Sequence, residues 1–257
     1  RPRRARARRH HRARRRPLMD WPLVLGLGLA VLAGGVVQSM IGFGMAVVAA
    51  PFVVLLAPDL MPTALLVPAM ALPVLQLSHA ERDVAWRPLG WAVGARTLAT
   101  PLGVAVVALV SPRAIAALVG VLILLTVALS IRTIELRPTP VNAAAAGAVS
   151  GVSGTAAAIG GPFLALVLQH ERPERVRSTL AVFFLAGSAL GLAGLAVGGL
   201  LTAEQVAVGG LWVPFVLLGY ATAAPLRARI DAERFRRLVL GFCVVASLVV
   251  IGRAVLS

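Results

Sequence analysis

The sequence predicts an all-α polytopic membrane protein with about eight transmembrane segments, arranged as two homologous repeats of four segments. Of the 257 residues, 59% are hydrophobic and only 14% are charged, whereas a soluble domain is about half apolar and about a quarter charged. Successive apolar runs reach or approach the ~20 residues that a helix needs to cross a bilayer. We therefore expect almost no sequence outside the membrane domain.

Eight apolar segments follow one another, separated by charged or turn-forming residues. Segments one to four match segments five to eight in the same order. Pro51 and the following Phe match Pro162 and its following Phe, and the motif around Pro101 matches the motif around Pro225. Several matches in one order predict an internal duplication. The segments cover approximately residues 21–57, 60–79, 88–110, 113–131, 140–169, 177–200, 204–225 and 236–256.

The first and fifth segments are the longest, and each contains a glycine-rich interruption at membrane depth. The first reads Gly35-Val-Val-Gln-Ser-Met-Ile-Gly-Phe-Gly44, and the second reads Ser150-Gly-Val-Ser-Gly-Thr155. Broken helices at corresponding positions of two halves indicate a transporter binding site, where freed N–H groups and hydroxyl or amide side chains attract anions. The alternative is close helix packing through small residues. The candidate residues for substrate binding are Gln38, Ser39, Gly42, Gly44, Ser150, Ser153, Gly154 and Thr155.

Arg96 is the only ionisable residue well inside an apolar segment. A charge at the bilayer centre costs at least ~2.5–3.5 kcal/mol, so such residues usually face a cavity or a partner. No carboxylate lies inside a segment to pair with Arg96, so a bound anion is the natural partner. The alternative is that Arg96 snorkels to an interface or caps the carbonyls of a nearby break. Its counterpart in the second repeat is Tyr220, a neutral donor, and we expect both residues to contact the substrate.

The distribution of arginine bears on topology, because cytoplasmic loops are enriched in basic residues. The basic loops are 82–87, 132–137, 172–177 and 227–237. All four lie on one side of the membrane if the fifth segment folds in and back as two short helices. If the first segment does the same, each repeat has an odd number of crossings and the two repeats are inverted. We expect inverted repeats.

The net charge of +15 comes largely from ten arginines in residues 1–16. A basic tail can bind anionic lipid or nucleic acid. The alternatives are a disordered juxtamembrane tail, or sequence upstream of the true start, because Met19 resembles a natural beginning. We expect no nucleic-acid partner. The predicted organisation is a basic tail at 1–18 and one transmembrane domain at 19–257. Its two repeats are expected at 19–135 and 138–257.

No pattern of an enzyme, a metal site or a cofactor site is present in the sequence. Cys243 is the only cysteine, and it is expected to pack as a small apolar residue. The four histidines lie in the tail or at segment ends, so they form no cluster of metal ligands. There is no phosphate-binding loop with a lysine, since the chain has no lysine. We therefore expect neither catalysis nor a bound cofactor.

The two glycine breaks, read from Gly35 to Pro51 and from Ser150 to Phe163, resemble those of the sulfite exporter TauE/SafE family of bacterial membrane permeases. The similarity covers about Asp20 to the C-terminus, although Gly-Phe-Gly stands here where other members have a run of glycines. The resemblance implies secondary transport of small anions, often sulfur oxyanions or organosulfonates, by a multi-pass protein of the bacterial inner membrane. The expected partners are thus a small anion and the lipid bilayer, and a homo-oligomer is compatible with the sequence. The competing hypothesis is a non-transporting membrane subunit that scaffolds or assembles a partner.

Overall fold

The computed structural model describes residues 20–42, 44–79, 83–131, 136–227 and 229–256. All regular secondary structure in these ranges is helical, which confirms the predicted all-α class. In chain order the helices are α1 (Trp21–Ile41), α2 (Met45–Leu56), the 3-10 helix η1 (Pro58–Leu60), α3 (Thr63–His79), α4 (Trp86–Leu109), α5 (Pro112–Ile131), α6 (Pro140–Ala157), α7 (Gly161–Val167), α8 (Pro173–Val197), α9 (Ala203–Arg227) and α10 (Ala232–Leu256).

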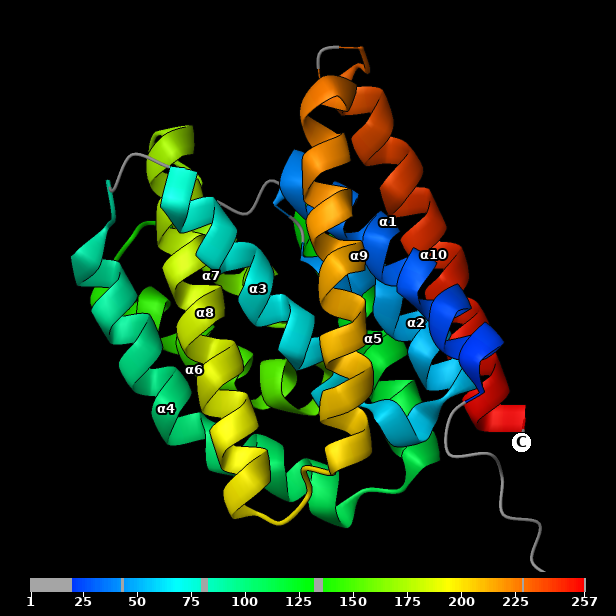
Figure 1. Ribbon diagram of the computed structural model, residues 1–257. Coiled ribbons are helices and arrows are strands. Elements are labelled where there is room, and N and C mark those ends of the chain that lie inside the picture. Colours follow the sequence, from blue (N-terminus) through cyan, green and yellow to red (C-terminus); the bar gives the residue numbers. More distant parts are fainter. Residues whose placement is uncertain (1–19, 43, 80–82, 132–135, 228, 257) are drawn as a thin grey trace, which may run out of the picture.

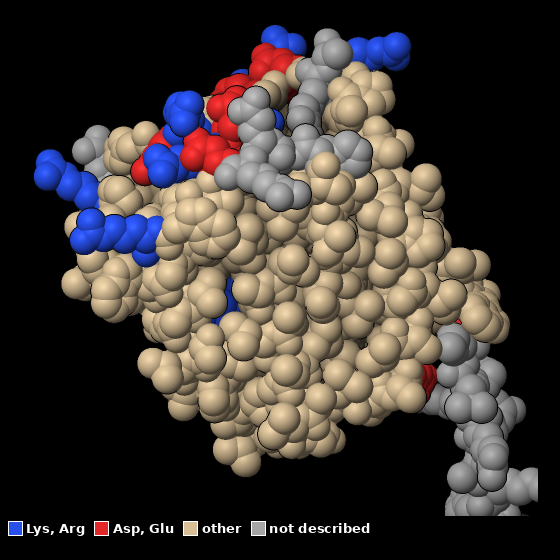
Figure 2. All heavy atoms as spheres, turned by 60° about the vertical axis from the view of Figure 1, so that its left-hand side comes forward, with Lys and Arg blue, Asp and Glu red and all other residues tan. Residues whose placement is uncertain are grey.

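Six of the described helices are long and apolar enough to cross a membrane, namely α1, α4, α5, α8, α9 and α10. Large apolar side chains cover much of the outside, and Leu98 and Val197 are 82% and 91% exposed. Figure 2 shows the same property as a broad uncharged surface below a charged end. Lipid contact accounts for this exposure, because a soluble protein rarely shows apolar patches of such extent. The chain is a membrane protein.

Both long apolar segments are broken, as predicted. The first breaks at Gly42 and Gly44, whose φ angles of 78° and 97° are left-handed and end α1 before α2 begins. The second breaks at Ala158, which ends α6 with a φ of 59°. Glycine adopts such angles without steric cost, so the glycines of the first interruption account for its position. α2 turns back along α1, and α7 turns back beside α6 (Figure 1).

The connections between helices lie at two opposite ends of the molecule. The connections α3–α4, α7–α8 and α9–α10 are at the upper end in Figure 1, and α4–α5 and α8–α9 are at the lower end. From the α7–α8 connection, Arg172 donates to Asp83 before α4, and Gln169 donates to the carbonyl of Leu136 before α6. The charged side chains visible in Figure 2 gather mainly at this upper end. The described parts of the predicted basic loops therefore share one end, which we call the basic end.

Each half of the chain packs its broken helix against the other half. α4 lies along α6, and α9 lies along α1. In both pairs a glycine lets the two helix backbones come close together. A Cβ at Gly147 on α6 would overlap the carbonyl of Ala92 on α4. A Cβ at Gly35 on α1 would lie 2.8 Å from the carbonyl oxygen of Val216 on α9. Small residues allow such close helix contacts in membranes. The packing thus brings α4 to the second break and α9 to the first.

Candidate functional site

Arg96 lies on α4 directly against the second break, and it is only 3% exposed. Three glycines make room for its guanidinium. A Cβ at Gly154 on α6 would lie 2.6 Å from Nη2, a Cβ at Gly160 in the break would lie 3.2 Å from Nη1, and a Cβ at Gly187 on α8 would overlap Cζ. The ring of Phe183, also on α8, lies under the guanidinium with its centroid 4.7 Å from Cζ, a cation–π contact.

The Arg96 guanidinium is buried without a counter-charge. It is the only buried charged side chain among the described residues, and no ion pair within those residues involves it. Its Nε and Nη1 atoms have no hydrogen-bond partner. Because the side chain ends inside the protein, it does not snorkel to the surface. A buried guanidinium with unused donors can form strong charge-assisted hydrogen bonds to an anion.

The three hydroxyl residues of the second break differ in what their hydroxyls contact. Ser150 Oγ donates to the carbonyl of Gly160 across the break, at 2.5 Å. Ser153 Oγ donates to the carbonyl of Val149 within α6, at 2.9 Å. Thr155 is fully buried, and its Oγ1 has no partner. Thr155 and Arg96 therefore supply the unused donors around this break.

The first break has a comparable bridge. Gln38 Oε1 accepts a hydrogen bond from the backbone N–H of Met45, the first residue of α2, at 2.7 Å. Ser39 Oγ donates to the carbonyl of Gly35 one turn earlier. Each break is thus bridged by a side chain from the helix that precedes it, Gln38 of α1 in the first and Ser150 of α6 in the second. Gly44 has no side chain to form such a bridge, and its role is to provide the positive φ angle directly before α2.

A cavity of about 510 Å³ reaches the first break. Among the predicted site residues it is lined by Gln38, Ser39, Gly42 and Tyr220, so Tyr220 of α9 faces the first break. Gln76, Glu171 and Arg177 add polar and charged groups to its wall. A second cavity of about 430 Å³ also reaches the first break and shares Met40, Ile41, Gly42 and Ala165 with the first cavity.

The sequence-predicted residues therefore form two groups. Gln38, Ser39, Gly42 and Tyr220 line the cavity, whereas Arg96 and the candidate residues of the second break do not line either of these cavities. Sequence reasoning missed Phe183 and Gly187, which contact Arg96 from α8. Their four-residue spacing places both residues on one face of α8, but the sequence does not show which residue that face contacts.

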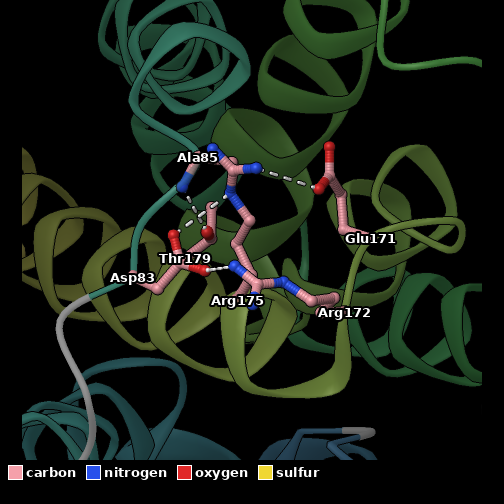
Figure 3. A network of polar contacts seen from close by, with 6 residues as sticks. All are labelled: Asp83, Ala85, Glu171, Arg172, Arg175 and Thr179. Atoms are coloured by element: carbon pink, nitrogen blue, oxygen red, sulfur yellow. Dashed lines mark hydrogen bonds and ion pairs between the residues drawn. The ribbon is translucent and has the colours of Figure 1, made fainter.

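Charged residues at the basic end form a network above these breaks (Figure 3). Arg172 Nη2 lies 2.6 Å from Asp83 Oδ2, and Arg175 lies between Asp83 and Glu171 at 3.5 and 3.3 Å. This network joins the residues before α4 to the start of α8. Among the described residues, no group of three or more His, Cys, Asp or Glu side chains could hold a metal ion.

The sequence matches one known family over nearly its whole length. A model of that family, sulfite exporter TauE/SafE, matches residues 9–250. The matched range includes both breaks, Arg96 and Tyr220. No curated protein and no solved structure matches the chain.

Proposed function

We propose that this chain, which belongs to the sulfite exporter TauE/SafE family, is a secondary permease that carries a small anion across the bacterial inner membrane. The observation that carries the proposal is the Arg96 guanidinium, buried beside a broken helix with two nitrogen atoms unpartnered. Ionisable residues inside membrane segments are rare, and they commonly mark substrate or ion pathways. Since the described residues offer Arg96 no carboxylate, the partner is the transported anion.

The substrate class follows from the donors that the fold supplies. Arg96 brings a planar guanidinium, which matches the oxygen atoms of a sulfonate, sulfite or carboxylate group. Gly154 and Gly160 of the second break lie against it, and Thr155 of the same break adds a buried hydroxyl that has no partner among the described residues. The proposed substrate is therefore a sulfur oxyanion, an organosulfonate or a small organic acid. An anion of this size also fits the cavity of about 510 Å³ at the first break.

The first break is the proposed second contact point on the pathway. Gln38, Ser39 and Tyr220 offer neutral polar groups there, and Gly42 and Gly44 open the backbone between α1 and α2. The cavity also includes Arg177 at the start of α8, which would attract anions at the basic end. By the enrichment of basic residues in cytoplasmic loops, this end faces the cytoplasm.

The proposed architecture is a pair of inverted repeats, which is a common basis of alternating access. Two observations support it. The glycine contacts Gly147 to Ala92 and Gly35 to Val216 occupy matching positions of the two halves. In addition, the first half begins at the lower end in Figure 1, whereas α6, which opens the second half, begins at the basic end. Rocking of one half against the other would expose the breaks alternately to the two sides.

Transport by the purified protein tests the proposal directly. The protein is reconstituted into liposomes, and the flux of labelled sulfite, thiosulfate and sulfoacetate is measured with imposed proton gradients and membrane potentials. We expect flux of at least one anion above that of protein-free liposomes. Absence of flux for all three, together with stable co-purification of one partner protein, would contradict the permease and support the scaffold hypothesis.

A further inference from the structure

One face of α8 follows α4 from the basic end down to Arg96. Arg175, Thr179, Phe183 and Gly187 are spaced by four residues, so they lie on the same side of the helix. Each contacts α4 or the residues just before it. Arg175 forms an ion pair with Asp83, and Thr179 accepts a hydrogen bond from the backbone of Ala85. Phe183 and Gly187 both pack against the guanidinium of Arg96. We call this line of contacts between α4 and α8 the seam.

The upper part of this seam is held by polar contacts, seen from close by in Figure 3. The carboxylate of Asp83 forms ion pairs with the guanidinium groups of Arg172, at 2.6 Å, and of Arg175, at 3.5 Å. The backbone N–H of Ala85 donates to Thr179 Oγ1 at 2.9 Å, in a buried position. We call these five residues, Asp83, Ala85, Arg172, Arg175 and Thr179, the α4–α8 latch. It ties the start of α4 to the first two turns of α8.

The lower part of the seam covers Arg96. Along α8, Phe183 comes one turn below Thr179, and Gly187 one turn below Phe183. Thr179 and Phe183 are fully buried, and Ala85 is only 3% exposed, so the seam is closed from the latch to the guanidinium. An anion that follows this seam from the basic end must separate α4 from α8 to reach Nε and Nη1 of Arg96.

We propose that the α4–α8 latch is a gate that controls access of anions to Arg96 from the basic end. The inference rests on the proposed function, in which Arg96 binds the transported anion. Exposed ion pairs are individually weak and salt-sensitive, and the Arg172 side chain is 75% exposed, so the outer contacts can open and close readily. The carboxylate of Asp83 also resembles the oxyanions proposed as substrates. An incoming anion therefore competes with Asp83 for Arg172 and Arg175, and loosens the latch as it arrives.

The experiment measures accessibility and needs no transport. Cys243 is the only cysteine of the chain, so Cys243→Ala with Arg96→Cys places a single thiol beneath the seam. A membrane-impermeant maleimide is added from the basic-end side of oriented vesicles, and the labelling rate is measured with and without Asp83→Asn. We expect Asp83→Asn to raise the rate at least tenfold, because it removes both ion pairs. Thr179→Val, which removes the buried acceptor, should also raise it.

Two controls separate the gate from general loosening. Asp83→Glu keeps the carboxylate and should leave the labelling rate low. Asp231→Asn removes the Asp231–Arg234 ion pair, which lies at the start of α10 and touches neither α4 nor α8, and it should also leave the rate low. An unchanged rate in both Asp83→Asn and Thr179→Val would overturn the gate, as would an equal rise in Asp231→Asn.

The outcome is distinguishable from failure of the proposed function. If the liposomes show anion flux but labelling is unaffected by the latch variants, the permease stands and the gate is wrong. If labelling responds as expected but no flux is found, the latch does close the seam, and the proposed transport is what fails.

Discussion

The guanidinium carbon of Arg96 occupies the space that a side chain at position 187 would need. Gly187→Ala must therefore displace either Arg96 or α8. Overpacking of this kind typically costs about 1–3 kcal/mol. We expect the variant to insert into the membrane but to lose most anion flux per folded protein, because the guanidinium is pushed from the second break.

The matched control for Gly187→Ala is Gly94→Ala on α4, two residues before Arg96. Nothing lies within 4 Å of a Cβ added at Gly94, so this variant should keep normal flux and normal thermal stability. Equal flux in Gly187→Ala and Gly94→Ala would show that the position of Arg96 does not matter for transport.

The side-chain bridges across the breaks should contribute to stability. Gln38→Leu leaves the buried N–H of Met45 without its acceptor, and an unsatisfied buried group costs about 1–3 kcal/mol. Ser150→Ala removes the donor to the Gly160 carbonyl and should cost about 1 kcal/mol. Both variants should unfold at lower temperature in detergent. Thr97→Val is the control, since its exposed hydroxyl bonds only within α4; an equal shift in all three variants would contradict the role of the bridges.

Proton coupling, if present, should not depend on a carboxylate in the cavity. Glu171 is the carboxylate that lines the cavity at the first break, and it is already paired with Arg175. Since a proton can travel with the anion as its conjugate acid, Glu171→Gln should leave the pH dependence of flux intact. Glu204→Gln, at the opposite end on α9, serves as the comparison. A pH profile that flattens in Glu171→Gln alone would identify Glu171 as a proton relay.

Much of the fold could be predicted from the sequence because hydropathy and glycine act locally. The helix boundaries follow from apolar runs, and the first break falls at Gly42 and Gly44, where left-handed angles favour glycine. The placement of the described basic-loop residues at one end follows from the two broken segments. Glu81 and Glu135, two carboxylates that lie between apolar segments in the sequence, lie outside the described residues.

The site was harder to predict because it depends on contacts between distant segments. The sequence identified Arg96 and both breaks, but it contained no information on which break Arg96 would meet. Arg96 reaches the second break because α4 packs closely along α6. This approach is possible because Gly147 has no side chain to overlap the carbonyl of Ala92. For the same reason Phe183 and Gly187 were missed, since a phenylalanine or a glycine in an apolar helix carries no signal of its partner.

Substitution of Arg96 tests whether its guanidinium binds the transported anion. Anion flux into liposomes is compared for the native protein, Arg96→Ala, Arg96→Gln, Arg96→Lys and Arg87→Ala, the last being an exposed arginine near the start of the same helix. Hydrogen bonds to charged groups are worth about 1.5–3 kcal/mol, so Arg96→Ala should lower flux by about 10-fold to 150-fold or abolish it. Arg96→Lys should weaken flux, because it keeps the charge but loses the planar fork, and Arg96→Gln should fall between Lys and Ala.

Arg87→Ala should transport normally, which would show that loss of an arginine from α4 is not harmful in itself. We therefore expect flux near background in Arg96→Ala at normal expression and folding. Normal flux in Arg96→Ala would contradict it, and the anion site would then rest on the backbone and hydroxyl groups of the two breaks alone.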